Sequence, residues 1–274
     1  MKILTLNTHS LQEENYAQKL EWFIERILVE QPDVIAMQEV NQTIAAPKAP
    51  PHTLRGLTSV SRGVPLREDN HAAVIAKRLQ LAGVPCSWAW LPIKIGYGKY
   101  DEGLAVLALN HTIRHAHSML ISHADDYANW KTRRILGVQL DDMDDWFYTV
   151  HMGWWNDETE PFRHQWKAMR ATLAQKSKTA PVWLMGDFNG PAEVRGESYD
   201  YITKAGWQDT YLLADEKDDG VTVSGVIDGW RDKIADPKKC SGMRIDQIWC
   251  SEKTEILSSK VIFNGENKIG RAHV

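Results

Sequence analysis

The chain has 274 residues, of which 43% are hydrophobic and 25% are charged, an ordinary globular composition with enough length for one large core. The formal net charge of −4 gives no bulk basic field that would attract nucleic acid. The three cysteines, Cys86, Cys240 and Cys250, are too few and too scattered for a disulfide framework or a zinc site.

The chain carries no sign of a linker, a leader or a membrane span. No Pro/Gly/Ser-rich or low-complexity tract divides it, so we expect a single domain. The sequence begins directly in a β-rich segment, with no charged and apolar leader and no long apolar run. We therefore expect a cytoplasmic protein, and we take it to be a monomer.

Apolar periodicity predicts the elements in chain order. Residues 2–7 alternate and are β-rich, which predicts a strand, whereas residues 15–30 have apolar positions at helical spacing. Residues 43–69 are rich in Pro, Gly and Ser and predict a long surface loop, and residues 215–219 predict a solvated acidic turn. Further strands are predicted over residues 34–40, 87–93, 103–109, 115–122, 134–140, 146–151, 181–187, 244–250 and 256–263. Further helices are predicted over residues 70–81, 161–175 and 199–205.

The order of these elements predicts a fold class. Strands in the middle of the chain follow one another as a meander, and helices are inserted on either side. Such an order favours an α+β fold in which two mostly antiparallel sheets pack face to face and are flanked by helices.

Polar side chains stand at the ends of strands that otherwise have the composition of a protein core. They are Asn7, Glu39, His151, Asp187, Asn189 and, within an apolar late strand, Asp246. A buried carboxylate is costly unless it has a partner or a metal. Each residue alone has an ordinary structural explanation, such as a turn cap, a core ion pair or an Asx turn. Their recurrence at five strand ends favours one shared site.

Metal-assisted hydrolysis of a phosphoester suits these residue types. Mg²⁺ prefers oxygen ligands and commonly takes only one or two carboxylates, which suits Glu39 with Asn7 beside it; Mn²⁺ is the alternative, and zinc fits worse. Asp187 would orient or deprotonate the attacking water. Asn189 and His151 would donate to phosphoryl oxygens.

Five segments resemble, in order, the successive motifs of the exonuclease–endonuclease–phosphatase superfamily. They are Thr5-Leu-Asn-Thr8, Met37-Gln-Glu-Val40, Thr149-Val-His-Met-Gly153, Met185-Gly-Asp-Phe-Asn189 and Arg244-Ile-Asp-Gln-Ile248. The resemblance implies a four-layer αββα sandwich. It also implies that Asn7 and Glu39 sit at the metal, that His151 contacts phosphate, and that Asp187 and Asn189 position the nucleophile and substrate. Asp246 would orient a histidine from a C-terminal Ser-Asp-His motif.

That last motif is absent from the sequence. His273 lacks the preceding Asp and a following strand, so we do not assign it this role. Residues 268–274 match what a common sequencing-library adapter encodes in one reading frame (AAG ATC GGA AGA GCA CAC GTC). We therefore expect a domain over residues 1–268 that lacks its final strand, followed by a non-native tail over residues 269–274.

Four further residues are candidates for contacting substrate. Glu102 lies in a polar segment before a strand, where a solvated turn is an equal alternative. Arg133 and Arg134 precede a strand and could reach phosphate, although one of them is expected to face solvent; we select Arg134. Trp154 and Trp155 follow His151 closely and could wall the cleft or contact a sugar, base or lipid face.

These observations predict a Mg²⁺- or Mn²⁺-dependent hydrolase of phosphoesters whose substrate is not specified. The acidic balance favours a phosphorylated small molecule or a phospholipid-like substrate over nucleic acid. An endonuclease or exonuclease acting on DNA or RNA is the alternative. Because the C-terminal histidine is missing, a catalytically impaired binding module on the same fold is a further alternative.

Overall fold

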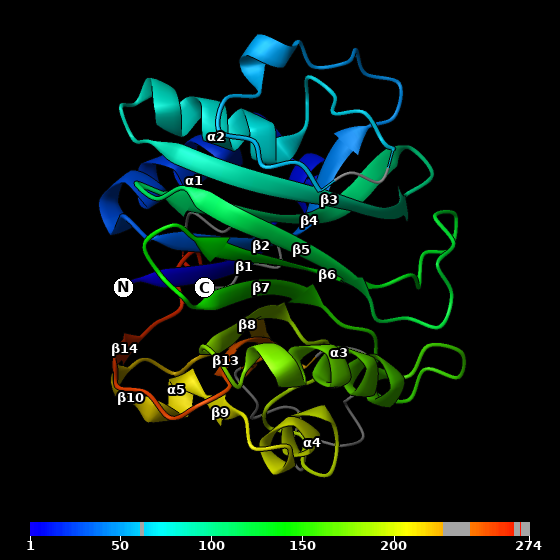
Figure 1. Ribbon diagram of the computed structural model, residues 1–274, viewed down its shortest axis with the longest axis vertical. Helices are drawn as coiled ribbons and strands as arrows, with labels where there is room; N and C mark the ends of the chain where they lie inside the picture. Colours follow the sequence, from blue (N-terminus) through cyan, green and yellow to red (C-terminus); the bar gives the residue numbers. More distant parts are fainter. Residues whose placement is uncertain (61–62, 227–241, 266–268, 270–274) are drawn as a thin grey trace.

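The computed structural model describes residues 1–60, 63–226, 242–265 and 269. Two sheets occupy the middle of the molecule, and helices lie against both outer faces (Figure 1). The first sheet has the strand order β1 (Ile3–Asn7), β2 (Val34–Thr43), β4 (Tyr100–Leu109) and β3 (Cys86–Gly96). The second has the order β5 (Ile113–Leu120), β6 (Arg134–Leu140), β7 (Trp146–His151), β8 (Val182–Asp187), β13 (Asp246–Cys250) and β9 (Gln208–Asp209).

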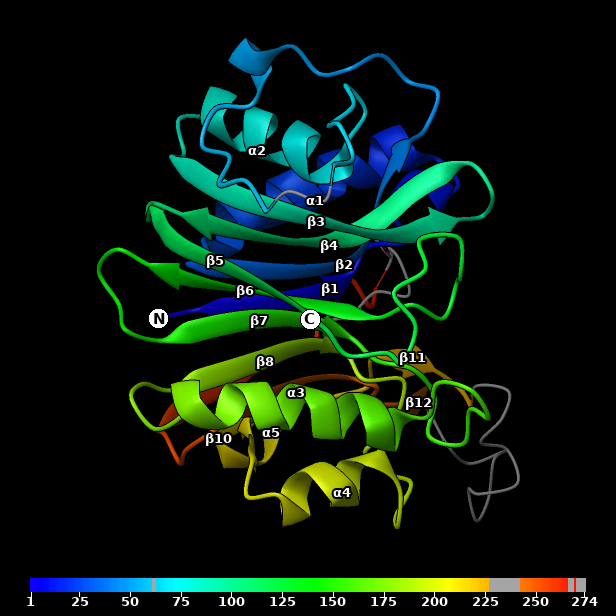
Figure 2. The same cartoon turned by 45° about the vertical axis from the view of Figure 1, so that its right-hand side comes forward.

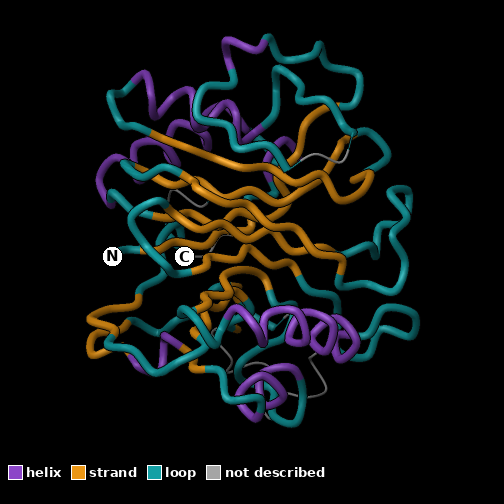
Figure 3. The backbone as a smooth tube through the Cα atoms, viewed as in Figure 1, coloured by secondary structure: helices purple, strands orange, loops and turns teal. Residues whose placement is uncertain are grey.

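Helices form the two outer layers. On the first sheet lie α1 (Tyr16–Glu30) and α2 (His71–Leu81), and on the second lie α3 (Phe162–Lys176) and α4 (Ser198–Lys204) (Figure 2). The short elements are α5 (Thr210–Leu213), β10 (Ala214–Lys217), β11 (Val223–Ser224), β12 (Gly242–Met243), β14 (Ile256–Ser259) and two 3₁₀ turns, Ser10–Gln12 and Pro51–Thr53. Strands fill the middle of the tube view and helices its margins (Figure 3).

Three apolar clusters hold the layers together. Phe23 and Ile27 of α1 pack with α2 onto the first sheet, and Trp166 and Met169 of α3 pack onto the second. Between the sheets, residues such as Val106 of β4 meet side chains of the second sheet. A sheet that is apolar on both faces needs cover on both sides. The predicted α+β, four-layer αββα sandwich is confirmed.

Two pairs of neighbouring strands in the main sheets are parallel, within sheets that are otherwise antiparallel as expected. β1 pairs with β2 in parallel, with α1 between them, and β7 pairs with β8 in parallel, with α3 between them. Parallel neighbours need a long crossover, which these helices provide. Within each pair, both strands therefore end at the same edge of their sheet. Gln38 Nε2 donates to Thr149 Oγ1 at 2.8 Å, which joins the middle of β2 to β7 across the sandwich.

Residues 215–219 differ in part from expectation. Residues 214–217 form β10, which pairs in parallel with β14. The side chains of Asp215 and Glu216 are nevertheless exposed, as a solvated segment requires. Backbone pairing at a sheet edge needs no apolar side chains, so the sequence pattern gave no signal for this strand.

The C-terminal segment is described only in part. Of the expected tail, Ile269 is described, and its side chain is buried in the cluster beneath α1. Residues 266–268 and 270–274, including His273, lie outside the described residues. Within the described ranges, no helix combines the length and apolar character needed to span a bilayer.

Candidate active site

An irregularity in the middle of β2 takes Glu39 out of the regular strand pairing, next to the end of β1. The pairing of β2 with β4 shifts register between Met37 and Val40, and Glu39 has φ of 52°. Such a bulge re-aims a side chain, and positive φ is strained for a residue other than glycine. The Glu39 side chain ends up buried, at 4% exposure.

Asn7, the last residue of β1, links the two sheets. Its Nδ2 donates to Glu39 Oε1 at 2.9 Å and to Asp187 Oδ2 at 3.1 Å. One amide group therefore holds two buried carboxylates near each other. The predicted proximity of Asn7, Glu39 and Asp187 is what the structure shows.

The second sheet brings three more predicted residues together. His151 of β7 and Asp246 of β13 both pair with Asp187 of β8, one from each neighbouring strand. Paired residues on adjacent strands project from the same face. His151 Nε2 lies 3.8 Å from Asp187 Oδ2. A histidine and two buried carboxylates thus lie side by side at one edge of the sheet.

The turn after β8 fixes Asn189. Asp187 Oδ1 accepts the Asn189 N–H at 2.8 Å, and Asn189 Nδ2 donates to the Met152 carbonyl at 2.8 Å. A side chain at Gly186, where φ is 155°, would lie 2.0 Å from the Val150 carbonyl oxygen, so this position requires glycine. The Asx turn considered for Asp187 is therefore present, and it leaves the Oδ2 side of the carboxylate for the site.

A buried ion pair anchors the start of β13 and with it Asp246. Arg244 donates to both carboxylate oxygens of Asp209, at 3.2 and 2.6 Å. Burial acts to lower the pKa of Arg244, but the Asp209 carboxylate outweighs it and the pKa is raised. Thr222 Oγ1 accepts the backbone N–H groups of Ile245 and Asp246. These bonds position the Asp246 backbone beside Asp187.

A pocket of about 270 Å³ opens over these strand ends. Its lining combines charged and amide groups with aromatic rings: Glu39, Lys94, Ile95, Gly96, Tyr97, Glu102, Trp130, Arg133, His151, Trp154 and Asn189. Four of the predicted polar residues, Glu39, Glu102, His151 and Asn189, therefore share one pocket. A concave site with a few convergent polar groups is where small ligands usually bind.

Two buried cations line this pocket. The sequence analysis missed Lys94, and of the two adjacent arginines it selected Arg134 where the structure has Arg133. Lys94 Nζ lies 3.1 Å from Glu102 Oε1 and donates to the Trp130 carbonyl at 2.9 Å. Arg133 Nη1 donates to the same carbonyl at 2.9 Å. Burial lowers the pKa of both Lys94 and Arg133. The signal for Lys94 was available, since it is a lone lysine between two isoleucines of an apolar strand.

Two of the four predicted substrate contacts are not at the pocket. Arg134 Nη2 donates to Asp125 Oδ2 at 2.7 Å, and its neighbour Arg133 lines the pocket instead. Trp155 is only 8% exposed and packs against Phe162, whereas Trp154 lines the pocket. In each pair one side chain faces the pocket and its neighbour packs away from it, and Trp155 does so in the turn that follows Trp154.

The oxygen-rich donor set suits a divalent ion such as Mg²⁺. Glu39 supplies a buried carboxylate beside the Asn7 amide, and Mg²⁺ often takes only one or two protein carboxylates. No group of three His, Cys, Asp or Glu side chains arranged to hold a metal occurs among the described residues. Asn7 presents Nδ2 to Glu39 here, so coordination through Oδ1 requires rotation of its amide.

Comparison with known proteins identifies relatives over the whole chain. The model of the Endonuclease/Exonuclease/phosphatase family matches residues 4–267. A solved endonuclease/exonuclease/phosphatase family protein from Leptotrichia buccalis C-1013-b is 32% identical, with a TM-score of 0.81, and the match covers 100% of this chain and 97% of that one. No curated protein matches.

More distant structures share the fold. A mannosyl-6-phosphatase of Bacteroides thetaiotaomicron VPI-5482 is 15% identical with a TM-score of 0.59, over 95% of this chain and 88% of that one. A truncated TDP2 of Caenorhabditis elegans is 15% identical with a TM-score of 0.56, over 98% of this chain and 94% of that one. The family match and the Leptotrichia relative agree with the strand-end motifs. The chain therefore belongs to the endonuclease/exonuclease/phosphatase family.

Proposed function

We propose that the chain is a divalent-metal-dependent hydrolase of phosphoesters that acts on small phosphorylated molecules. The observation that carries the proposal is a set of contacts beside one pocket. Glu39, His151 and Asn189 line the pocket, and Asn7 and Asp187 contact Glu39 and His151 from beneath its lining. Family membership supports phosphoester hydrolysis as the class of reaction. The pocket itself supports the choice of a small substrate.

The groups around Asp187 suit attack by water on phosphorus. Asp187 Oδ2, which faces Asn7 Nδ2 and His151 Nε2, orients the water and takes up its proton. His151 donates from Nε2 to a non-bridging phosphoryl oxygen, which gains charge in the transition state. Asn189 directs its amide toward the same phosphate, and its Met152 contact keeps that amide in place.

Two groups of residues handle charge. Glu39, with Asn7 after rotation of its amide, would hold Mg²⁺ or Mn²⁺. When bound, the ion supplies Lewis-acid stabilisation of charge on the phosphoryl group. Lys94 and Arg133 add two buried cations to the lining of the same pocket, where they would offset the charge of a bound phosphate.

The size and charge of the pocket argue against a polymeric substrate. A volume of about 270 Å³ takes a small ester but not a stretch of duplex. The net charge of −4 disfavours long-range attraction of nucleic acid. The mannosyl-6-phosphatase of the same fold acts, by its name, on a phosphorylated sugar. A phospholipid-like ester, whose head group alone enters the pocket, is the second substrate class that fits.

A substrate panel tests the proposal. Purified protein with MgCl₂ or MnCl₂ is assayed against sugar phosphates, inositol phosphates, sphingomyelin, single-stranded DNA and duplex DNA. We expect metal-dependent release of phosphate or of the head group from a small ester, and no cleavage of DNA. Cleavage of DNA with no turnover of any small ester would reject the assignment in favour of a nuclease.

A further inference from the structure

Two tryptophans form an exposed corner at the pocket. Trp130 is 52% exposed and Trp154 is 49% exposed, and both line the pocket. Their ring centroids lie 6.0 Å apart with the planes at 62°. Large aromatic side chains are usually buried. Two exposed rings in contact at a pocket therefore indicate a surface whose burial by a ligand is favourable.

The backbone of Trp130 is tied to the buried cations. Its carbonyl accepts from Lys94 Nζ and from Arg133 Nη1, both at 2.9 Å. The backbone of Trp130 is therefore held next to the groups that we expect to bind phosphate. A ligand with its phosphate at Arg133 has its remaining part close to the two rings.

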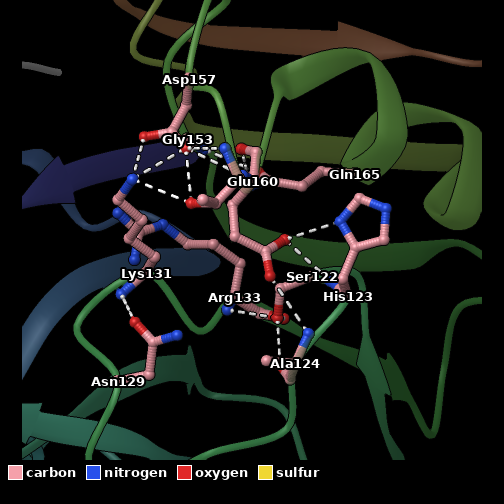
Figure 4. Close-up of polar contacts among 11 residues, drawn as sticks. Ser122, His123, Ala124, Asn129, Lys131, Arg133, Gly153, Asp157, Glu160 and Gln165 are labelled. Carbon is pink, nitrogen blue, oxygen red and sulfur yellow. Dashed lines mark hydrogen bonds and ion pairs between the residues drawn. The ribbon is translucent and has the colours of Figure 1, made fainter.

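An ion pair joins the loops that carry the two tryptophans. Lys131, next to Trp130, contacts Asp157 on the loop after β7, with Nζ 2.9 Å from Oδ1 and 2.8 Å from Oδ2 (Figure 4). Asp157 Oδ1 also accepts the N–H groups of Thr159 and Glu160. The loop that follows Trp154 is thereby folded on itself and attached to the Trp130 loop.

A second acidic residue, Glu160, also joins the two loops that carry the tryptophans. Glu160 is buried, and its carboxylate accepts the backbone N–H groups of His123 at 2.8 Å and Ala124 at 3.1 Å (Figure 4). Gln165 Oε1 accepts the N–H of Gly153, the residue before Trp154. Two loops from different strand connections are thus held as one unit. Such pre-ordering lowers the entropy that a ligand must overcome on binding.

We propose that Trp130 and Trp154 form a subsite for the alcohol part of the substrate, and that this part is a ring with an apolar face. The inference rests on the phosphoesterase function proposed above and adds the class of ester to it. A sugar ring and an aromatic ring both present such a face, and either would cover the exposed indoles. Lys131 and Asp157 are positioning residues, which set the angle of the corner without touching the ligand.

The test compares ring esters with an acyclic one. Values of kcat and KM are measured for glucose 6-phosphate, phenyl phosphate and ethyl phosphate with the wild-type protein and with Trp130→Ala and Trp154→Ala. Tyr201→Ala is the matched control, since Tyr201 is an exposed aromatic residue that does not line the pocket. Calorimetric titration of the Asp187→Asn variant with the same esters gives affinities in the absence of turnover.

We expect a preference of about 10-fold in KM for one ring ester over ethyl phosphate, lost in both tryptophan variants and kept in Tyr201→Ala. Which ring ester is preferred distinguishes a carbohydrate from an aromatic alcohol. Asp157→Asn should reduce the same preference while kcat for ethyl phosphate stays within about twofold, which a general loss of structure would not produce.

The two proposals fail in different ways. Turnover with no ring preference, or a preference that survives in Trp130→Ala, overturns the subsite and leaves the hydrolase standing. Ring-dependent binding without hydrolysis of any ester overturns the hydrolase and leaves the subsite standing.

Discussion

His151 and Asp187 occupy paired positions at the ends of the parallel strands β7 and β8, with Nε2 3.8 Å from Oδ2. This spacing exceeds a good hydrogen bond, so the two groups are close but not directly bonded. Asn7 Nδ2 approaches Asp187 Oδ2 from the first sheet. The arrangement around Asp187 therefore depends on strands from both sheets. It is the basis for proposing that Asp187 orients and deprotonates the attacking water.

Replacement of Asp187 by Asn tests that role. The amide keeps an oxygen to accept the Asn189 N–H, so the turn should persist, but the base is lost. We expect kcat to fall at least about 100-fold. Urea unfolding should show stability equal to or above that of the wild type, since one of several neighbouring buried carboxylates is removed. A kcat within threefold of wild type would remove Asp187 from the mechanism.

The adjacent arginines provide a matched pair. Arg133 lines the pocket, whereas Arg134 bonds to Asp125. Arg133→Met should weaken inhibition by inorganic phosphate about 10-fold or more, since a buried cation is lost from the phosphate site. Arg134→Met should leave it unchanged within about twofold. If the two variants are affected alike, the assignment of Arg133 to phosphate is wrong.

Asp157 gives a pH-dependent contribution to stability. Burial acts to raise its pKa, but the hydrogen bonds from Lys131 and from the N–H groups of Glu160 and Thr159 outweigh it and hold the pKa well below the usual value. A carboxyl group whose pKa is lower in the folded than in the unfolded chain stabilises the fold at pH values above its unfolded pKa, near 4. This stabilisation is lost as the pH falls through the pKa of the folded state.

The variant Asp157→Asn should therefore be less stable than wild type at pH 7, by about 1–2 kcal/mol from the loss of charge-assisted hydrogen bonds. The difference should shrink as the pH is lowered below 4. Urea unfolding curves at pH 7 and pH 3 measure it. An unchanged difference at the two pH values would show that the charge of Asp157 contributes nothing.

His71, at the start of α2, should govern stability at a higher pH. Its side chain is buried, Nδ1 lies 2.9 Å from the Tyr16 hydroxyl, and burial lowers its pKa from 6.5 to about 3. The unfolded chain then binds a proton that the folded chain does not, so stability falls as pH drops below about 6.5. We expect a loss of about 2 kcal/mol between pH 7 and pH 5.

The variant His71→Gln tests this assignment, because its side chain does not titrate. Its stability should change less over the same pH range. Thermal unfolding at pH 7 and pH 5 compares the two proteins. Equal losses in both would place the acid sensitivity elsewhere.

Much of the fold and the polar strand ends could be predicted from the sequence. The apolar runs before Asn7, His151 and Asp187 are long enough to identify buried strands, and a polar residue at such an end is a clear departure from the pattern. Glu39 differs, because β2 continues to Thr43 and Glu39 lies at a bulge within it. The motif order then suggested the αββα sandwich. The parallel pairing through α1 and α3 was missed, because periodicity identifies strands but not their neighbours.

The pocket's other residues depend on tertiary structure. Two pairs of neighbours illustrate this: Arg133 with Arg134, and Trp154 with Trp155. Which member of each pair faces the pocket depends on the backbone conformation of its loop, and the sequence pattern does not give that conformation. Trp130 lies in the β5–β6 connection, and its place beside Trp154 follows from the ion pair between Lys131 and Asp157. No feature of the local sequence predicts that contact.

The proposed function is tested most directly by measuring how ester hydrolysis depends on a divalent metal and on Glu39. Hydrolysis of the preferred small ester is measured over a range of MgCl₂ concentrations, with and without EDTA, for the wild type and Glu39→Gln. Gln keeps the size of the side chain and an oxygen for Asn7 Nδ2 but removes the negative charge. We predict that EDTA abolishes wild-type turnover, that Mg²⁺ restores it, and that Glu39→Gln is inactive at every concentration. Turnover that persists in EDTA, or a variant as active as wild type, would contradict the account.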